Sequence, residues 1–405
     1  MKKFFNIGPG TWVTAAFIGP GTVTVCTLAG VQFGFSLLWA LVLSIIACVV
    51  LQEMAARLGV VTQKGLSEVL KSQFDNKIVR GILIALILSA IFIGNAAYEA
   101  GNISGGALGL STLLESSGDN EQSISINYFS IAIGIIAFVL LYIGNYKVLE
   151  RSLIVLVLLM SAAFIVIAIV TKPDLSLLFR GFVPDFSTDN ILTIVGLIGT
   201  TVVPYNLFLH ASIVSEKWKS TEDLPEAKKD TIVAIILGGL VSMAIIITGA
   251  AIQETEINNA ADLAKGLEPV FGSMAKYVLS VGLFSAGITS AITAPLGAAY
   301  VVKGCLGWQS NLKSKSFRAV WMFILFLGVL FSSLGIKSIV IIQFAQVANG
   351  LLLPIIAAFL LWVMNQQKIL GKYTNTWKQN LIGIFILVIT CFLGFRGVWK
   401  VIINL

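Results

Sequence analysis

Charged residues are scarce in this sequence. Asp, Glu, Lys and Arg make up only 12% of its 405 residues, whereas a soluble domain carries roughly 25%. Hydrophobic residues make up 57% of the chain, and the mean hydropathy is +0.93. This composition excludes an ordinary soluble globular protein and predicts an integral membrane protein.

Cysteine, histidine and nucleotide-binding motifs are also rare. The chain has one histidine and four cysteines without paired spacing, so we predict neither a disulfide nor a zinc framework. No Gly-x-x-x-x-Gly-Lys-Ser/Thr motif is present, so direct use of ATP is not expected. We also find no nucleophile constellation or His/Cys metal cluster, and therefore predict a protein that is not an enzyme and needs no cofactor.

Long apolar segments dominate the chain and do not alternate as barrel strands do. Each segment has roughly 20 residues, enough to cross a bilayer as a helix. We predict an all-α membrane protein of eleven spans, near 11–33, 35–56, 79–109, 127–145, 152–171, 190–214, 231–252, 270–302, 317–335, 338–364 and 379–400.

Basic residues lie mostly in alternate loops, which explains the net charge of +7 without a nucleic-acid partner. The 57–80 and 216–230 loops are rich in lysine, whereas the 110–126 and 253–269 loops carry mainly acidic residues. The positive-inside rule then places the N-terminus in the cytoplasm and, after eleven spans, the C-terminus outside. We predict a multi-pass protein of the cell membrane.

Two proline-containing breaks interrupt apolar segments about half a chain apart. Gly19-Pro20-Gly21-Thr22 breaks the first span, and Val203-Pro204-Tyr205-Asn206 breaks the sixth. Proline and glycine weaken a helix, and freed backbone groups in lipid need protein or a cavity around them. The breaks are either simple kinks or a transport site between inverted repeats, and their matching positions favour the site. The repeats would cover about 8–172 and 189–365, with an extra helix at about 378–401.

Several polar residues lie inside apolar spans. Asn95, Glu99 and Asn102 share one helical face in the third span. A carboxylate in the membrane suggests a proton relay or cation site, although a structural pairing with another helix is also open. His210 follows the second break and suits either a proton path or helix packing. Gln346 in the tenth span suits either a binding site or helix association.

The motifs resemble the Nramp family of metal-ion transporters. The similarity runs over most of the chain and rests on Ile7-Gly8-Pro9-Gly10, Ile18–Thr22, Gln32–Trp39, Ala55–Thr62 and the run from Pro204 to Ser212. The resemblance implies a LeuT-type fold, with eleven helices in two inverted five-helix repeats plus one and with helices 1 and 6 broken. It also implies proton-coupled uptake of manganese or iron.

The metal ligands of that family are replaced in this sequence. Its Asp-Pro-Gly-Asn motif reads Gly19-Pro20-Gly21-Thr22, and its Met-Pro-His motif reads Val203-Pro204-Tyr205. A glutamine expected in helix ten falls on Leu352. A thioether helps to select transition metals, and carboxylates offset the cost of dehydrating a dication. We therefore expect weak or no binding of manganese and iron.

The resemblance and the breaks together define the expected site. The family's Asp-x-x-Glu pair falls on Glu99 and Asn102, which with His210 form the expected proton pathway. The expected substrate-binding residues are Ala16, Gly19, Gly21, Thr22, Thr200, Val203, Tyr205, Asn206 and Gln346. The leading hypothesis is a secondary-active transporter of a metal cation, as the resemblance implies, with weak or no binding of manganese and iron.

Two other hypotheses stay open at this stage. Neutral pocket oxygens, and the helix N-termini at the breaks, would also suit a small organic or zwitterionic solute. A receptor that kept the fold without transport is the second alternative. The sequence identifies neither the coupling ion nor the oligomeric state.

Overall fold

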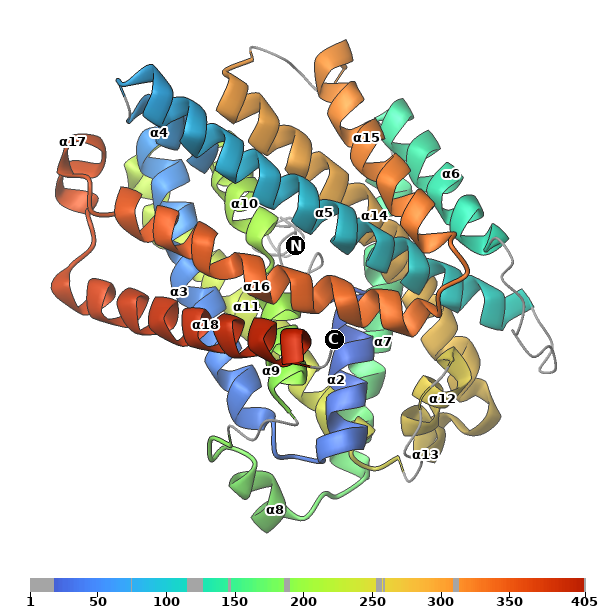
Figure 1. The fold of residues 1–405 in the computed structure, drawn as a ribbon. Coiled ribbons are helices and arrows are strands. Elements are labelled where there is room, and N and C mark those ends of the chain that lie inside the picture. The colour runs from blue at the N-terminus through green and yellow to red at the C-terminus, as the bar shows by residue number, and fades with distance from the viewer. Residues whose placement is uncertain are drawn as a thin grey trace.

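The computed structural model describes residues 18–73, 75–114, 127–144, 147–185, 190–252, 257, 259–308 and 313–403. These residues are almost entirely helical (Figure 1). Within them, nine helical segments are long and apolar enough to cross a membrane. They contain α3 (Leu38–Thr62), α5 (Lys77–Leu114), α7 (Lys147–Val170), α9 (Ile191–Thr201) with α10 (Pro204–Lys217), α11 (Leu224–Gly249), α14 (Ala275–Leu306), α15 (Lys315–Ser332), α16 (Ser338–Val363) and α18 (Trp377–Ile403).

The other two expected spans correspond to shorter helices among the described residues. The fourth forms α6 (Tyr128–Ile143), an apolar helix of 16 residues. The first is represented by α2 (Pro20–Phe33), because residues 11–17 lie outside the described part of the chain. Short helices, which composition alone does not predict, occupy the connections: α4 (Leu66–Ser72), α8 (Leu175–Arg180), α12 (Ala260–Ala264), α13 (Glu268–Phe271) and α17 (Gln367–Leu370).

Both predicted breaks are helix boundaries. α2 begins at Pro20, and α10 begins at Pro204. Proline suits the first position of a helix, because the amide hydrogen that it lacks would have no partner there. Between α9 and α10, Val202 and Val203 leave the helical conformation, with ψ angles of 78° and 122°.

α5 lies beside α14, α15 and α16 (Figure 1). Small residues allow membrane helices to approach closely, and the stretch of α14 around Ser285–Pro295 is mostly buried, as its composition predicts. A hydrogen bond also joins the two helices, because the Asn95 amide donates to the Ala294 carbonyl at 2.8 Å. Both α5 and α14 contact α2 and α10, and α16 contacts α2, α9 and α10.

Candidate functional site

The two breaks meet in the interior of the protein. The Thr22 and Thr200 hydroxyl oxygens are 2.8 Å apart, so a hydrogen bond joins the first turn of α2 to the last turn of α9. Both threonines are buried. The structure therefore brings together two predicted site residues that are 178 positions apart in sequence.

Gln346 on α16 lies directly against the start of α2. A Cβ atom on Gly21 would overlap the Gln346 amide, so the bare glycine makes the space that this side chain occupies. Gln346 is 1% exposed, and neither polar atom of its amide has a hydrogen-bond partner among the described residues. An unpaired buried amide is costly, which marks Gln346 as a group that faces a ligand or water.

Tyr205 and Asn206 add two further buried polar groups at the start of α10. The Tyr205 ring lies against Tyr98 of α5, with 5.6 Å between the ring centroids. Within the described residues, the Tyr205 hydroxyl and the Asn206 Oδ1 atom have no hydrogen-bond partner. Val203 is also buried and caps α10 in an extended conformation.

Gly19, another predicted site residue, directly precedes α2. Its carbonyl accepts a hydrogen bond from the Val23 amide at 3.2 Å. The last carbonyls of a helix have no partner within it, so the C-terminus of α9 adds backbone oxygens to the same region. Ala16, the remaining predicted site residue, lies outside the described residues.

The resemblance places Leu352 at the position of the family's helix-ten glutamine. Its side chain packs against Gly94 of α5. Gln346, six residues earlier in α16, is the glutamine that contacts the first break.

Glu99 is completely buried between α5 and α15, where its side chain packs on Gly328. In the described part of the chain, the Glu99 oxygens and the Asn102 amide nitrogen have no hydrogen-bond partner on a neighbouring helix. The expected structural alternative, a pairing of Glu99 with a partner on a neighbouring helix, is not seen among these residues.

His210 points toward α11 and forms a local hydrogen bond there. Its Nε2 atom is 3.0 Å from the Thr231 hydroxyl, which itself donates to the Ala227 carbonyl. With the Thr231 hydrogen directed to Ala227, the His210 Nε2–H group donates to the Thr231 oxygen. No hydrogen bond or ion pair connects His210 to Glu99 within the described ranges.

The described residues contain no group of three His, Cys, Asp or Glu side chains able to share a metal ion. The central site therefore offers hydroxyl, amide and carbonyl groups, all of them neutral. Such a set can coordinate a cation that keeps much of its hydration shell, but it does not favour a soft transition metal.

The natural resistance-associated macrophage protein-like family model matches residues 10–400. The chain belongs to the Nramp family. It is 26% identical over 400 residues to a divalent metal cation transporter MntH of Caldanaerobacter subterraneus, covering 95% of this chain and 91% of the relative. An MntH of Verminephrobacter eiseniae is also 26% identical, covering 91% and 83%.

Solved structures confirm the fold of this Nramp protein. The Eremococcus coleocola manganese transporter in complex with an aromatic bis-isothiourea substituted compound superposes with a TM-score of 0.75 at 20% identity, covering 97% of this chain and 86% of the other. MhsT in complex with L-phenylalanine gives a TM-score of 0.65 at 14% identity and 98% coverage of both chains. The LeuT-type fold is therefore confirmed, and this Nramp protein is a multi-pass membrane protein.

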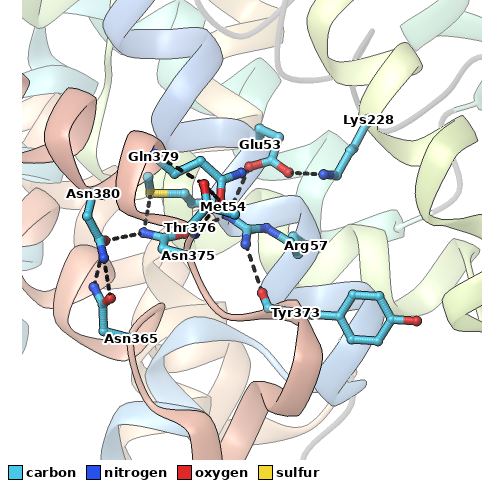
Figure 2. Close-up of polar contacts among 10 residues, drawn as sticks. All are labelled: Glu53, Met54, Arg57, Lys228, Asn365, Tyr373, Asn375, Thr376, Gln379 and Asn380. Carbon is cyan, nitrogen blue, oxygen red and sulfur yellow. Dashed lines mark hydrogen bonds and ion pairs between the residues drawn. The ribbon is translucent and has the colours of Figure 1, made fainter.

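This Nramp protein has a second polar cluster, which is centred on Arg57 of α3 (Figure 2). The guanidinium group of Arg57 donates to the Tyr373 carbonyl at 2.8 Å, to Asn375 Oδ1 at 2.7 Å and to Glu53 at 3.2 Å. Glu53 also pairs with Lys228 of α11 at 2.7 Å. We call these five residues the Arg57 cluster.

The Arg57 cluster connects α3 and α11 to the segment between α16 and α18. Asn375 continues the network by donating to Asn380 at 3.0 Å, and Asn380 exchanges hydrogen bonds with Asn365 at the end of α16 (Figure 2). The Arg57 side chain is only 4% exposed, whereas that of Lys228 is 35% exposed. The sequence alone does not reveal the partners of Arg57 and Glu53.

We expect Arg57→Leu to destabilise the protein by about 3 kcal/mol, because it leaves the Tyr373 carbonyl and Asn375 Oδ1 without their buried donor and removes one of the two cations that pair with Glu53. Lys228→Met is the matched control: it removes a half-exposed partner of the same carboxylate and should cost less than about 1 kcal/mol. Thermal and denaturant unfolding of both variants in detergent measures the difference. Equal losses would show that Arg57 acts no differently from a surface charge.

Proposed function

We propose that this Nramp protein is a secondary-active transporter that moves a largely hydrated divalent cation through the site between α2, α9 and α10. The observation that carries the proposal is the group of buried, unpaired neutral polar atoms on Tyr205, Asn206 and Gln346 beside the two breaks. The family and the divalent metal cation transporters among its relatives support a cation as cargo.

The chemistry of this site argues for a hard cation. Hard cations prefer oxygen ligands, and Mg²⁺ in particular keeps several of its waters when bound. The partial negative charge at the C-terminus of α9 also favours a positive ligand. Manganese and iron would find no thioether or carboxylate at Gly19, Thr22 or Val203, so we propose that they bind weakly or not at all.

We expect calorimetry in detergent to show no micromolar manganese binding. Gly19→Asp combined with Thr22→Asn and Val203→Met should raise manganese affinity at least tenfold, because it adds a carboxylate and a thioether. The matched control combines Gly19→Asn, Thr22→Asn and Val203→Leu, which fill similar space without charge or sulfur. Micromolar affinity in the unmodified protein would contradict the proposed weak site.

The same titration with Mg²⁺, Ca²⁺ and a set of amino acids tests the cargo class. A heat signal from Mg²⁺ or Ca²⁺ that Asn206→Ala weakens would support the hydrated-cation site. A signal from an amino acid alone would instead support a solute carrier. Uptake into proteoliposomes separates either carrier from a receptor without transport.

We further infer proton coupling through Glu99, Asn102 and His210, two inverted repeats at about 8–172 and 189–365, and an extra helix at about 378–401. The N-terminus is proposed to be cytoplasmic and the C-terminus external. The concentration of lysine in the 57–80 and 216–230 loops supports this orientation.

A further inference from the structure

A groove at one end of the bundle lies outside the transport site. It is enclosed by the ends of α3, α7 and α11 and by the short helix α8, with a volume of about 690 Å³. This volume falls within the range of about 300–1,000 Å³ that is typical of ligand sites. Every lining side chain is apolar except that of Lys172.

The position of the groove along the helices places it near a membrane surface. Leu38 is the first residue of α3, and Ile169 and Ile247 lie in the last turns of α7 and α11. Figure 1 shows α8 at the same end of the bundle as α12 and α13. Because these helices cross the membrane, the apolar floor of the groove faces acyl chains and its rim lies at the level of lipid headgroups.

The wall that α8 provides is held in place. The Trp39 amide of α3 donates to the Gly181 carbonyl, directly after α8, at 2.9 Å. Asp174 caps the start of α8 by accepting a hydrogen bond from the Ser176 amide at 2.8 Å. The side chain and amide of Ser176 also hold the pKa of the Asp174 carboxyl below its usual value. The groove is therefore formed before any ligand arrives.

Lys172 lies at the rim of the groove and has an unfavourable backbone conformation. Its φ angle is +45°, in the left-handed region where glycine is the usual residue after a helix. Lys172 is exposed, and its backbone amide donates to the Ile169 carbonyl at 3.3 Å. Its ammonium group forms no ion pair within the described part of the chain. A lysine kept at a position that favours glycine, beside an apolar groove, suggests a role for its charge.

We propose that this groove binds one anionic phospholipid, with an acyl chain along the apolar lining and the headgroup phosphate on the Lys172 ammonium group. Charge complementarity selects this occupant over a purely apolar partner, because the single polar lining group is a cation at headgroup level. A lysine at headgroup level attracts anionic lipids electrostatically. The site is separate from the proposed transport path and does not depend on its cargo.

Native mass spectrometry of the purified full chain tests the proposal, with phosphatidylglycerol and phosphatidylcholine of identical acyl chains offered at equal concentration. We expect the protein to retain phosphatidylglycerol about fivefold better. Lys172→Gln should bring the ratio to about one. Ala168→Trp, which fills the groove from α7, should reduce retention of both lipids.

Lys276→Gln is the matched control, because it removes another lysine at the same end of the bundle, in the first turn of α14. It should leave the lipid ratio unchanged. The proposal is overturned if Lys172→Gln and the unmodified protein retain the two lipids in the same ratio, or if Ala168→Trp retains them as well as the unmodified protein. Dissociation of a dimer by Ala168→Trp, with lipid retention unchanged, would assign the groove to a second copy of the chain and also overturn it.

Discussion

Gly199→Ala is expected to destabilise the transporter by about 2–3 kcal/mol, because overpacking of a tight contact costs this much. At Gly199, α9 crosses α16 with backbone against backbone. A Cβ atom there would overlap the Gln346 carbonyl oxygen and lie 2.6 Å from the Gly350 nitrogen. Neither atom can rotate away as a side chain would, so the helices must separate.

Gly196→Ala is the matched control, since Gly196 lies one turn earlier in the same helix. A Cβ atom at Gly196 would meet only the Val25 and Val347 side chains, at the ordinary contact distances of 3.5 and 3.7 Å. Alanine is favoured over glycine within a helix by up to about 1 kcal/mol, so this variant should be neutral or more stable. Unfolding in detergent measures both, and equal stabilities would contradict the tight crossing.

The crossing also connects stability to the site, because Gln346 contributes both its carbonyl to the contact with Gly199 and its side chain to the contact with Gly21. A shift of α16 away from α9 would move the Gln346 amide away from the first break. Gly199→Ala is therefore expected to weaken cargo binding as well, whereas Gly196→Ala should preserve it.

The helix boundaries at the site could be predicted from the sequence because their cause is local. α2 begins at Pro20 and α10 begins at Pro204. Proline interrupts a helix and fits its first position whatever surrounds it, because it lacks an amide hydrogen and its φ angle is fixed. The polar face of Asn95, Glu99 and Asn102 follows in the same way from helical periodicity, and all three residues are buried.

The partners of these residues could not be predicted, because they depend on how distant helices pack. Helical periodicity gives no information on the Thr22–Thr200 hydrogen bond or on the contact between Gln346 and Gly21.

Glu99→Gln is expected to abolish the pH dependence of transport while leaving cargo binding within a few-fold of the unmodified protein. Glu99 is buried against Gly328 of α15 and makes no hydrogen bond within the described residues to the groups at the two breaks. Glutamine keeps the shape of the side chain but cannot exchange a proton near neutral pH. An effect on coupling without an effect on binding therefore follows if Glu99 carries the transported proton.

Thr22→Ala is expected to have the opposite effects, with weaker cargo binding and an unchanged pH dependence of transport. It removes a hydroxyl at the start of α2 and leaves Thr200 without that partner, so cargo binding should weaken by about 1–3 kcal/mol. Its remaining transport should still respond to pH, because Glu99 is intact. Uptake into proteoliposomes between pH 5.5 and 8, at the divalent cation concentration set by calorimetry, measures both variants. If Glu99→Gln transports with the pH dependence of the unmodified protein, Glu99 has a structural role and the coupling proton, if there is one, takes another route.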